Sequence, residues 1–506
     1  MIVLDLSTDN TMTFLAILFT AVAVCLATVL VLRLTHACLS PLRDIPGPFI
    51  TRWSDAWYAW RVHKGNFERE NIQLHRTYGP IIRYGPNRYS ISDSEAVNTI
   101  YGHGARFTKS SWYYAWQHPQ KPNLFADRSI QRHGETRRQL QSTYTMTSLV
   151  SYEPYVNQCS DIFSQRLAEM AAAGTSVDMG HWLQCYAFDV IGEITFGRRF
   201  GFLDQGVDIE GLMSAIEASL AYASVLGIYP RIHPLGFKVF NFMAGSKGGG
   251  RAYVEVFART MVAEHERNRQ KSMTENGSTL AEPFVSKFLT RHEEAPERFS
   301  KANIVAGCTS NVAAGSDTTG VSLSAIIYYL LKYPRYLQAL RMEIAKFQKQ
   351  GALSESYDFK QTQEMPFLQA VIKEGLRMHP ATGLPLERCV FNNGTIVGIS
   401  SWVLHRDKTV FGEDVDDFNP ERWLTDDKEK LAAMNRQWIP FGMGSRTCIG
   451  RHISTLEISK LIPRIVQDFD FELSDGITGS EKSWSTRNHW FVKPVGFRVR
   501  VSRRSS

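Results

Sequence analysis

A single cysteine, Cys448, lies in the glycine-rich sequence Phe-Gly-Met-Gly-Ser-Arg-Thr-Cys-Ile-Gly at positions 441–450. Glycines let a backbone approach a bound group closely and leave its amide groups free to bond to a sulfur atom. A thiol in such a loop can act as a nucleophile, as a structural side chain or as a metal ligand. These ten residues alone leave the three roles open.

An acid and an alcohol are adjacent at Asp317 and Thr318, in the segment Ala-Gly-Ser-Asp-Thr-Thr at 314–319. The segment lies in the middle of a proline-free helical pattern at 302–331. It is poor helix-forming material, because glycine costs about 1 kcal/mol relative to alanine and hydroxyl side chains can bend a helix. Two interpretations are open: tight packing against another helix, or a local bulge that makes room for a small molecule beside a proton-passing pair.

Glu374 and Arg377 are three residues apart and share one face of a predicted helix. Most such pairs are surface salt bridges worth less than about 1 kcal/mol. Arg422 follows in the segment 418–423, among residues that we expect to be buried. Because one carboxylate can accept bonds from two guanidinium groups, these three side chains could join two distant segments.

The elements that must position these residues are mostly helices. Helical spacing without proline is found at 149–173, 182–195, 212–225, 251–270 and 302–331. Strand-like alternation is found at 78–92, after residue 384 and at 497–501. We therefore expect a mainly α fold with minor β, the strands lying near the ends of the chain.

The N-terminal segment differs from the rest of the chain. Positions 12–32 contain no charged residue, which is long enough to cross a hydrocarbon core of about 30 Å at about 1.5 Å per residue. Arg33 and Arg43 follow this run, so the positive-inside rule puts the body of the protein in the cytosol. A cleaved signal peptide is the alternative, but its basic flank would lie on the other side. We expect a lumenal tail at 1–11, a transmembrane anchor at 12–32, a proline-containing hinge at 33–50 and a catalytic domain at 51–506.

The overall composition narrows the possible partners and compartment. The chain has 506 residues with 57 Lys and Arg against 50 Asp and Glu, and the excess is not gathered in one block. We therefore expect no nucleic-acid partner, while a basic face for an acidic protein remains open. The seven cysteines are odd in number and widely spread, which argues against a disulfide framework and favours a reducing compartment.

Four ordered motifs carry a resemblance to a known family. The residues Phe441, Gly444, Arg446, Cys448 and Gly450 resemble the haem-binding signature of the cytochrome P450 family, Phe-x-x-Gly-x-Arg-x-Cys-x-Gly. Segment 314–319 resembles the oxygen-activating part of its long distal helix, and Glu374, Arg377 and Arg422 resemble its Glu-x-x-Arg motif and third partner. Segments 70–93, 100–116 and 148–156 resemble the fungal pisatin-demethylase-like branch, whose members tailor secondary metabolites.

The resemblance implies haem b, with Cys448 as the axial thiolate ligand of its iron, which favours cleavage of the O–O bond. The haem propionates call for cations. The candidates are Arg446, Arg388, and the i, i+4 pair His133 and Arg137, in which histidine replaces the tryptophan of the family motif. An ordinary surface role is the alternative for each of these cations. Phe441 would shield the sulfur from water, Gly444 would allow close backbone approach, and Gly450 would let the following helix pack tightly.

On the opposite face of the haem, the resemblance gives Thr318 and Asp317 the delivery of protons during O2 activation. The expected substrate pocket contains Trp112, Phe125, Ala314 and Trp490. Aromatic side chains at such positions suit a bulky apolar ligand, but they could equally be core packing.

One segment departs from the family pattern. After Arg388 the chain continues Cys-Val-Phe-Asn-Asn-Gly and reaches Thr395, where family members usually place a longer strand pair. The missing part would border the substrate cavity and help to position Arg388. The two explanations are a mispredicted exon boundary and a natural form with weakened haem binding.

Together these features predict a monooxygenase of the endoplasmic reticulum membrane, single-pass, with a cytosolic catalytic domain. It would use O2 and electrons from NADPH-cytochrome P450 reductase to hydroxylate, epoxidise or O-demethylate a bulky apolar small molecule. A terpenoid, polyketide or aromatic compound of fungal secondary metabolism is the expected substrate class. The alternatives are a haem-binding protein without oxygenase activity, impaired at the shortened segment, and a single-pass membrane interaction protein whose motifs are accidental.

Overall fold

The structure is a computed structural model that describes residues 6–245, 249–272, 281–390, 394–474 and 484–504. The first half of the chain forms the helices α1 (Leu6–Leu39), α2 (Ala56–Lys64), α3 (Phe67–Tyr78), α4 (Ser94–Tyr101), α5 (Ile130–Leu140), α6 (Met146–Val150), α7 (Glu153–Ala173), α8 (Met179–Phe196), α9 (Phe202–Gln205), α10 (Leu212–Leu226), α11 (His233–Met243) and α12 (Arg251–Ser272). The second half forms α13 (Phe284–Glu294), α14 (Lys301–Lys332), α15 (Pro334–Lys349), α16 (Phe359–Gln363), α17 (Pro366–Met378), α18 (Ser401–Leu404), α19 (Lys408–Phe411), α20 (Lys428–Gln437) and α21 (Arg451–Asp468). Short 3₁₀ helices used below are η2 (Ser111–Trp116) and η6 (Pro420–Leu424).

The strands are short and pair over long distances in sequence. They are β1 (Ile81–Gly85), β2 (Arg88–Ile91), β3 (Thr108–Lys109), β4 (Ser176–Asp178), β5 (Arg388–Cys389), β6 (Ile396–Gly398), β7 (Phe469–Leu473), β8 (Ser485–His489), β9 (Phe491–Val495) and β10 (Arg498–Arg503). In the described residues they form sheets with the orders β1-β2-β6-β5-β3, β4-β10-β7 and β8-β9. The fold is mainly helical with small sheets, as the sequence predicts.

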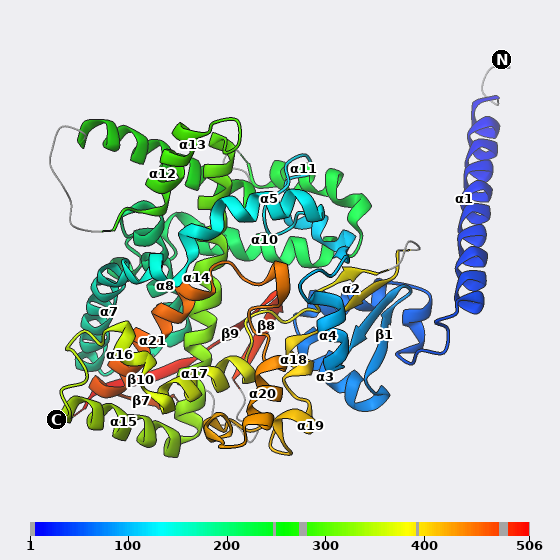
Figure 1. The fold of residues 1–506 in the computed structure, drawn as a ribbon. Helices are drawn as coiled ribbons and strands as arrows, with labels where there is room; N and C mark the ends of the chain where they lie inside the picture. The colour runs from blue at the N-terminus through cyan, green and yellow to red at the C-terminus, as the bar shows by residue number, and fades with distance from the viewer. Residues whose placement is uncertain (1–5, 246–248, 273–280, 391–393, 475–483, 505–506) are drawn as a thin grey trace.

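Helix α14 runs through the middle of the body (Figure 1) and packs against α8, α12, α17 and α21. Every residue from 301 to 332 is α-helical, so the expected bulge at 314–319 is wrong. The hydroxyls of Ser316 and Thr318 donate to carbonyl oxygens one turn earlier, at 2.8 Å each, without breaking the helix. A Cβ on Gly315 would lie 3.1 Å from Ile191 of α8. The glycine therefore serves tight helix packing, the other interpretation of this segment.

The helical pattern at 149–173 is also divided differently from the prediction. The chain leaves the helix at Ser151 and Tyr152, so that α6 and α7 are separate. Pro154 lies in the first turn of α7. Proline is tolerated there because the first helical residues have no intrahelical partner for their N–H groups. A new helix start thus explains the break.

Helix α1 projects away from the body as a separate rod (Figure 1). Its large apolar side chains are exposed, for example Phe14, Ile17 and Phe19. Within the described residues, the helical stretch long and apolar enough to cross a membrane is Ile209–Leu226, and a third of it is buried in the body. Within α1, Thr13–Cys25 is an apolar stretch whose side chains the structure describes. Both explanations of the N-terminal segment thus remain open in the fold.

Candidate functional site

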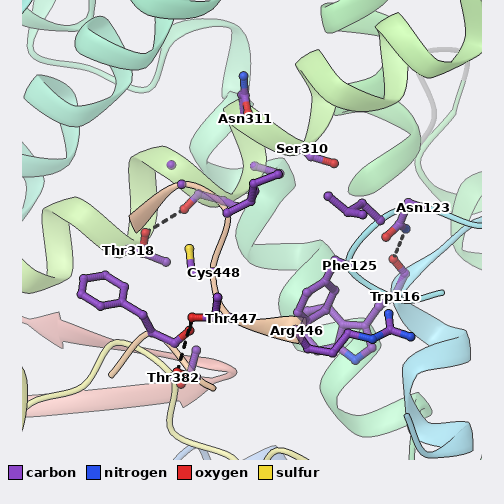
Figure 2. A pocket seen from close by; sticks show the side chains of 18 of the residues that line it. Trp116, Asn123, Phe125, Ser310, Asn311, Thr318, Thr382, Arg446, Thr447 and Cys448 are labelled. Carbon is purple, nitrogen blue, oxygen red and sulfur yellow. Dashed lines mark hydrogen bonds between the residues drawn. The ribbon is translucent and has the colours of Figure 1, made fainter. Parts of the chain in front are cut away.

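A cavity of about 480 Å³ lies between α14 and the loop that carries Cys448 (Figure 2). Cys448 and Thr318 face this space from different elements, and Phe125 and Arg446 border it farther along. Helices α5, α10 and α12 and the β8–β9 turn complete its wall. The cavity thus brings together residues from distant parts of the chain, from Tyr101 to Phe491.

The loop before α21 holds Cys448 by backbone bonds. The Cys448 N–H donates to the Phe441 carbonyl at 2.8 Å, and the Thr447 hydroxyl donates to the same oxygen at 3.2 Å. Gly444 has a φ of +64°, and a Cβ there would lie 1.8 Å from the Tyr101 carbonyl oxygen. Only glycine therefore fits this turn.

The electrostatics of Cys448 distinguish between the roles that the loop sequence left open. Burial raises the pKa of the Cys448 thiol, although the N–H group of Gly450 and the charge of Arg137 lower it in part. A nucleophilic cysteine needs a lowered pKa, whereas a metal ion deprotonates a coordinating thiol by itself. The Cys448 side chain is also exposed to the cavity, where a group that carries a metal ion could reach the sulfur.

Two residues of the loop differ in their surroundings. Phe441 lines the cavity and packs edge-on against Trp438, with ring centroids 6.1 Å apart. Gly450 was expected to permit tight packing of the next helix, but a Cβ there would meet no atom within 4 Å. This expectation is wrong, because Gly450 faces the cavity and not the body of α21.

Five cationic or titratable side chains gather at the cavity without enough negative charge to balance them: Arg446, Arg388, Arg137, His133 and Lys109. Burial and the nearby Arg388 lower the pKa of Arg446 to about 10. Burial, with Arg446 and Arg137, lowers the pKa of His133 to about 3. The Arg446 Nη2 atom is buried without a hydrogen-bond partner in the described residues. These groups fit a ligand that brings two carboxylates, as the propionates of haem do.

The carboxylate that lines this cavity, Asp127, is already engaged. Both of its oxygens accept bonds from Arg132, at 2.6 and 2.7 Å. Arg446 and Arg137 instead donate to the backbone carbonyls of Asp127 and Thr447, each at 2.7 Å. Backbone oxygens therefore hold Arg446 and Arg137 at the cavity, and these two guanidinium groups keep their positive charge for a ligand.

Lys109 is a member of this cluster that the sequence patterns did not single out. It is buried in β3, opposite Arg388 in β5, and donates to the Phe125 carbonyl. Burial lowers its pKa well below the ordinary value, and Arg388 and Arg446 add to the effect. A strand of two residues is too short to show the alternation by which strands are predicted. The sequence feature that could have indicated Lys109 is its place just before an aromatic run.

Arg388 lies in the cavity wall despite the shortened segment that follows it. Strand β5 pairs with β6 (Arg388 opposite Val397) and with β3. The Arg388 guanidinium lies over the Tyr101 ring, 4.9 Å from its centroid. Positions 391–393 lie outside the described residues. The strand pair is thus short and still supports Arg388.

The residue before Arg388 is held by a buried network that sequence spacing did not reveal. The Glu387 carboxylate accepts bonds from Arg88 at 2.5 Å, Tyr84 at 2.9 Å and Ser110 at 2.7 Å. Arg88 also contacts Asp55, at 3.1 Å. This set of residues, called the Glu387 network below, joins β1, β2 and η2 to the strand of Arg388.

The adjacent residues Asp317 and Thr318 point in different directions. The Thr318 side chain lines the cavity, and its hydroxyl donates to the Ala314 carbonyl (Figure 2). Asp317 does not line the cavity. It accepts a bond from Gln184 and forms an ion pair with Lys493 at 2.8 Å. Successive helical residues are about 100° apart around the axis, so the predicted pair cannot face one ligand together.

An aromatic wall closes the cavity at the β8–β9 turn. Trp490, Phe125 and Trp116 line it, and Ala314 does so from α14. Trp490 has a φ of +88°, and its carbonyl accepts a bond from Gly383 N–H at 2.8 Å that fixes this unusual backbone. Trp112 does not line the cavity, contrary to expectation. It lies behind Trp116 and Trp490, where its Nε1–H donates to the Ser224 carbonyl at 3.0 Å.

The three residues expected to join distant segments do meet. Glu374 accepts two bonds from Arg377, each at 2.8 Å, and one from Arg422 at 3.0 Å. Asn419 N–H and Trp423 Nε1–H complete the set at 2.9 Å. Burial would raise the pKa of Glu374, but Arg377 and Arg422 hold it below the usual range. The group is called the Glu374 network below.

The Glu374 network supports the Cys448 loop through tryptophans. Trp423, which donates to Glu374, packs edge-on against Trp438 at 6.3 Å between ring centroids. Trp438 in turn packs against Phe441 of the loop. An exposed surface salt bridge has no such buried neighbours. The Glu374–Arg377 pair is therefore part of the buried structure that supports the Cys448 loop.

A family model described as cytochrome P450 matches residues 46–491 of the chain. The chain belongs to the cytochrome P450 family. A cytochrome P450 monooxygenase of Aspergillus terreus is 37% identical over 448 residues, which cover 85% of this chain and 90% of the relative. A pisatin demethylase of Fusarium vanettenii is 36% identical over 474 residues (90% and 88%). The cytochrome P450 monooxygenase cicH of Emericella nidulans is 34% identical over 490 residues (94% and 95%).

This P450 is therefore an oxidoreductase of the monooxygenase class, similar to fungal enzymes of secondary metabolism. Its family binds haem b through a cysteine thiolate. The family also implies O2, a reductase as redox partner and an organic substrate. The cation cluster described above fits the propionates of that haem.

Proposed function

We propose that this P450 is anchored in the endoplasmic reticulum membrane and inserts one oxygen atom of O2 into a bulky apolar small molecule. The observation that carries the proposal is the cavity in which Cys448, Thr318 and an aromatic wall meet beside a cluster of uncompensated cations. Hydroxylation, epoxidation and O-demethylation all fit this class. The relatives support a tailoring step in fungal secondary metabolism, and we propose a terpenoid, polyketide or aromatic compound as the substrate.

Each residue of the site has a distinct task in this proposal. Haem, when bound, supplies the oxygen chemistry, which a thiolate ligand promotes. Arg446, Arg388, Arg137, His133 and Lys109 hold its propionates. The aromatic wall orients the substrate and excludes water, and Gly450 leaves space for the macrocycle beside Cys448.

Thr318 holds and passes protons at the cavity. Its hydroxyl hydrogen is donated to Ala314, so the oxygen lone pairs remain available to accept a proton. Asp317 lies on the next face of the helix, paired with Lys493, whose side chain reaches the surface. We assign Asp317 the supply of protons from that side, which requires its carboxylate to part from Lys493.

The N-terminal helix supports the membrane part of the proposal. The large apolar side chains that the structure describes in the uncharged run, such as Phe14, Phe19 and Val31, are exposed, and Arg33 and Arg43 follow this run. We propose residues 1–11 as a lumenal tail, 12–32 as the anchor, 33–50 as the hinge and 51–506 as a cytosolic catalytic domain that accepts electrons from NADPH-cytochrome P450 reductase.

The alternative of a haem protein without oxygenase activity depends on a misplaced Arg388. Arg388 instead lines the cavity and is supported by β3, β6 and the Glu387 network. This favours the oxygenase.

Purified protein should show the red-shifted Soret band of a reduced carbon-monoxide thiolate complex, and Cys448→Ala should abolish it. With reductase and a panel of terpenoid, polyketide and aromatic scaffolds, Thr318→Ala should keep the band but divert NADPH electrons to peroxide. Ser324→Ala is the matched control, since Ser324 makes the same type of bond, to the Gly320 carbonyl, away from the cavity. Equal product formation by the Thr318 variant would refute its proposed role.

A further inference from the structure

A second cationic feature of the cavity lies apart from the propionate cluster. Arg251, the first residue of α12, lines the cavity together with Ser219 of α10 and Asn303 of α14. The charged group that acts on the pKa of Arg251 is Glu255, whereas the cations of the cluster act on one another. Arg251 thus adds a cation to the cavity from α12, an element that carries no member of the propionate cluster.

Arg251 differs from the other cations of the cavity in its lack of a partner. Lys109, Arg132, Arg137, Arg388 and Arg446 each donate to an oxygen. Arg251 makes no hydrogen bond or ion pair with any residue that the structure describes. Glu255, one turn along α12, accepts its bond from Arg259 at 2.9 Å. No group of the described chain therefore engages the guanidinium, and burial lowers its pKa.

A hydroxyl on the facing helix is also free. In α14 the hydroxyls of Thr309, Ser316, Thr318, Thr319, Ser322 and Ser324 all donate to oxygen atoms of the protein. Ser310 makes no such bond within the described part of the chain, although it lines the cavity. Figure 2 shows its side chain directed away from the helix, on the side of the loop that carries Asn123. Helices α12 and α14 pack together, and Arg251 and Ser310 line the same cavity from these two helices.

The cavity offers no carboxylate to neutralise Arg251, because Asp127 is the acid that lines it and is bound to Arg132. A cation on a largely apolar wall is costly unless an anion pairs with it. One carboxylate matches one guanidinium in charge and in the geometry of its two oxygens. A phosphate dianion would leave negative charge uncompensated at Arg251.

We propose that the substrate is an apolar carboxylic acid whose carboxylate binds Arg251, with Ser310 as a second donor. The proposal rests on the oxygenase function proposed above and narrows its substrate class. With the carboxylate at Arg251, the apolar body of the acid would fill the rest of the cavity, which Trp116, Phe125 and Trp490 line.

The test compares a carboxylic acid with its own methyl ester, abietic acid and methyl abietate, both bulky and apolar. Binding to holoenzyme is followed by the Soret shift, and binding is also followed by quenching of tryptophan fluorescence, which does not need haem because Trp116 and Trp490 line the cavity. The wild-type protein should bind the acid about 10- to 100-fold more tightly than the ester, as expected for bonds to a charged group.

Arg251→Gln should remove this preference by weakening the acid alone, and Arg251→Lys should keep part of it. Ser310→Ala should weaken the acid about threefold, near the lower range for a single hydrogen bond. Arg267→Gln is the control, an exposed arginine of the same helix that does not line the cavity.

Each outcome decides between the two proposals. Equal binding of acid and ester, binding of neither, or an acid preference that survives Arg251→Gln overturns the carboxylate site. The oxygenase proposal stands in those cases if the carbon-monoxide thiolate spectrum and reductase-dependent oxidation of other scaffolds are present. Absence of that spectrum with intact acid preference in fluorescence would refute the oxygenase and keep the carboxylate site.

Discussion

Two buried glutamates each hold an arginine, but they do so by different means. Glu374 is bound by side chains and an amide that lie within 49 residues along the chain. Glu387 is bound by Arg88, Tyr84 and Ser110, which are 277–303 residues away. The Glu374 network supports the loop of Cys448, and the Glu387 network supports the strand of Arg388. The Cys448 loop is thus supported by residues that are close together in the sequence, whereas the strand of Arg388 is supported by residues that are far apart in the sequence.

The largest effect is expected from Glu374→Gln. Loss of the charge leaves the buried Arg377 with neutral acceptors alone, whereas Arg422 keeps Asp414 at 3.0 Å; breaking a buried ion pair in this way should cost about 3–5 kcal/mol. Yield of haem-loaded protein and the midpoint of urea unfolding should both fall. Glu421→Gln, at an exposed position of η6, is the control and should behave as the wild type. An unchanged urea midpoint for Glu374→Gln would show that the network does not stabilise the fold.

Glu387→Gln should have a smaller and more selective effect. Arg88 keeps Asp55 as an ionic partner at 3.1 Å, so about 1–3 kcal/mol is expected. Because Glu387 holds the strand of Arg388, the variant should lose haem to an excess of a haem-scavenging protein faster than the urea midpoint alone would suggest. Equal rates of haem loss in variant and wild type would show that the Glu387 network does not contribute to haem retention.

Lowering the pH should destabilise the Glu374 network and the residues around it in two steps. His405 bonds to the Arg377 carbonyl and accepts from Ile439 N–H, and burial lowers its pKa from 6.5 to about 3. Below pH 6.5 the imidazole of His405 is protonated in the unfolded state but stays neutral in the folded state. The free energy of unfolding therefore falls by up to about 1.4 kcal/mol for each pH unit by which the pH is lowered. The pKa of Glu374 is lowered from 4.5, so its contribution is present above pH 4.5 and is lost as the pH falls below it.

Urea midpoints measured from pH 8 to about 4 would check this order. The variant His405→Gln should flatten the decline that begins near pH 6.5. The partly buried His75 and the buried His379, whose pKa values are lowered to about 4, and His133, whose pKa is lowered to about 3, should maintain the rest. A slope identical to that of the wild type would contradict the assignment to His405.

The smallest effect is expected at a pair with the same spacing as Glu374 and Arg377. Arg166 and Glu169 are also three residues apart and lie 2.7 Å from each other, but the Glu169 side chain is 49% exposed. Glu169→Gln should change the free energy of unfolding by less than about 1 kcal/mol. A loss as large as that of Glu374→Gln would mean that spacing, and not burial, decides the strength of such pairs.

Local spacing explains what could be predicted. The Cys448 loop and the long helix α14 could be predicted because their residues are close together in the sequence. The Glu374 network could be predicted because Glu374 and Arg377 share a helix face and Arg422 lies in the nearby segment 418–423. Glu387, Arg88 and Lys109 could not be predicted, because they meet across strands of two to four residues that have no readable period. Asp317 and Trp112 were assigned to the cavity by their neighbours in sequence, and the direction of their side chains depends on tertiary packing.

The long separation in the five-stranded sheet also has a consequence for synthesis. Arg88 and Glu387 are 299 residues apart, so at about 5–20 residues per second the partner of β2 leaves the ribosome about 15–60 s later. During that time β1 and β2 have only each other, and a two-stranded hairpin is marginally stable in water. The edge of β2 that later receives β6 stays open, and open strand edges pair with other chains. The nascent protein therefore depends on protection of its first sheet until translation has passed residue 398.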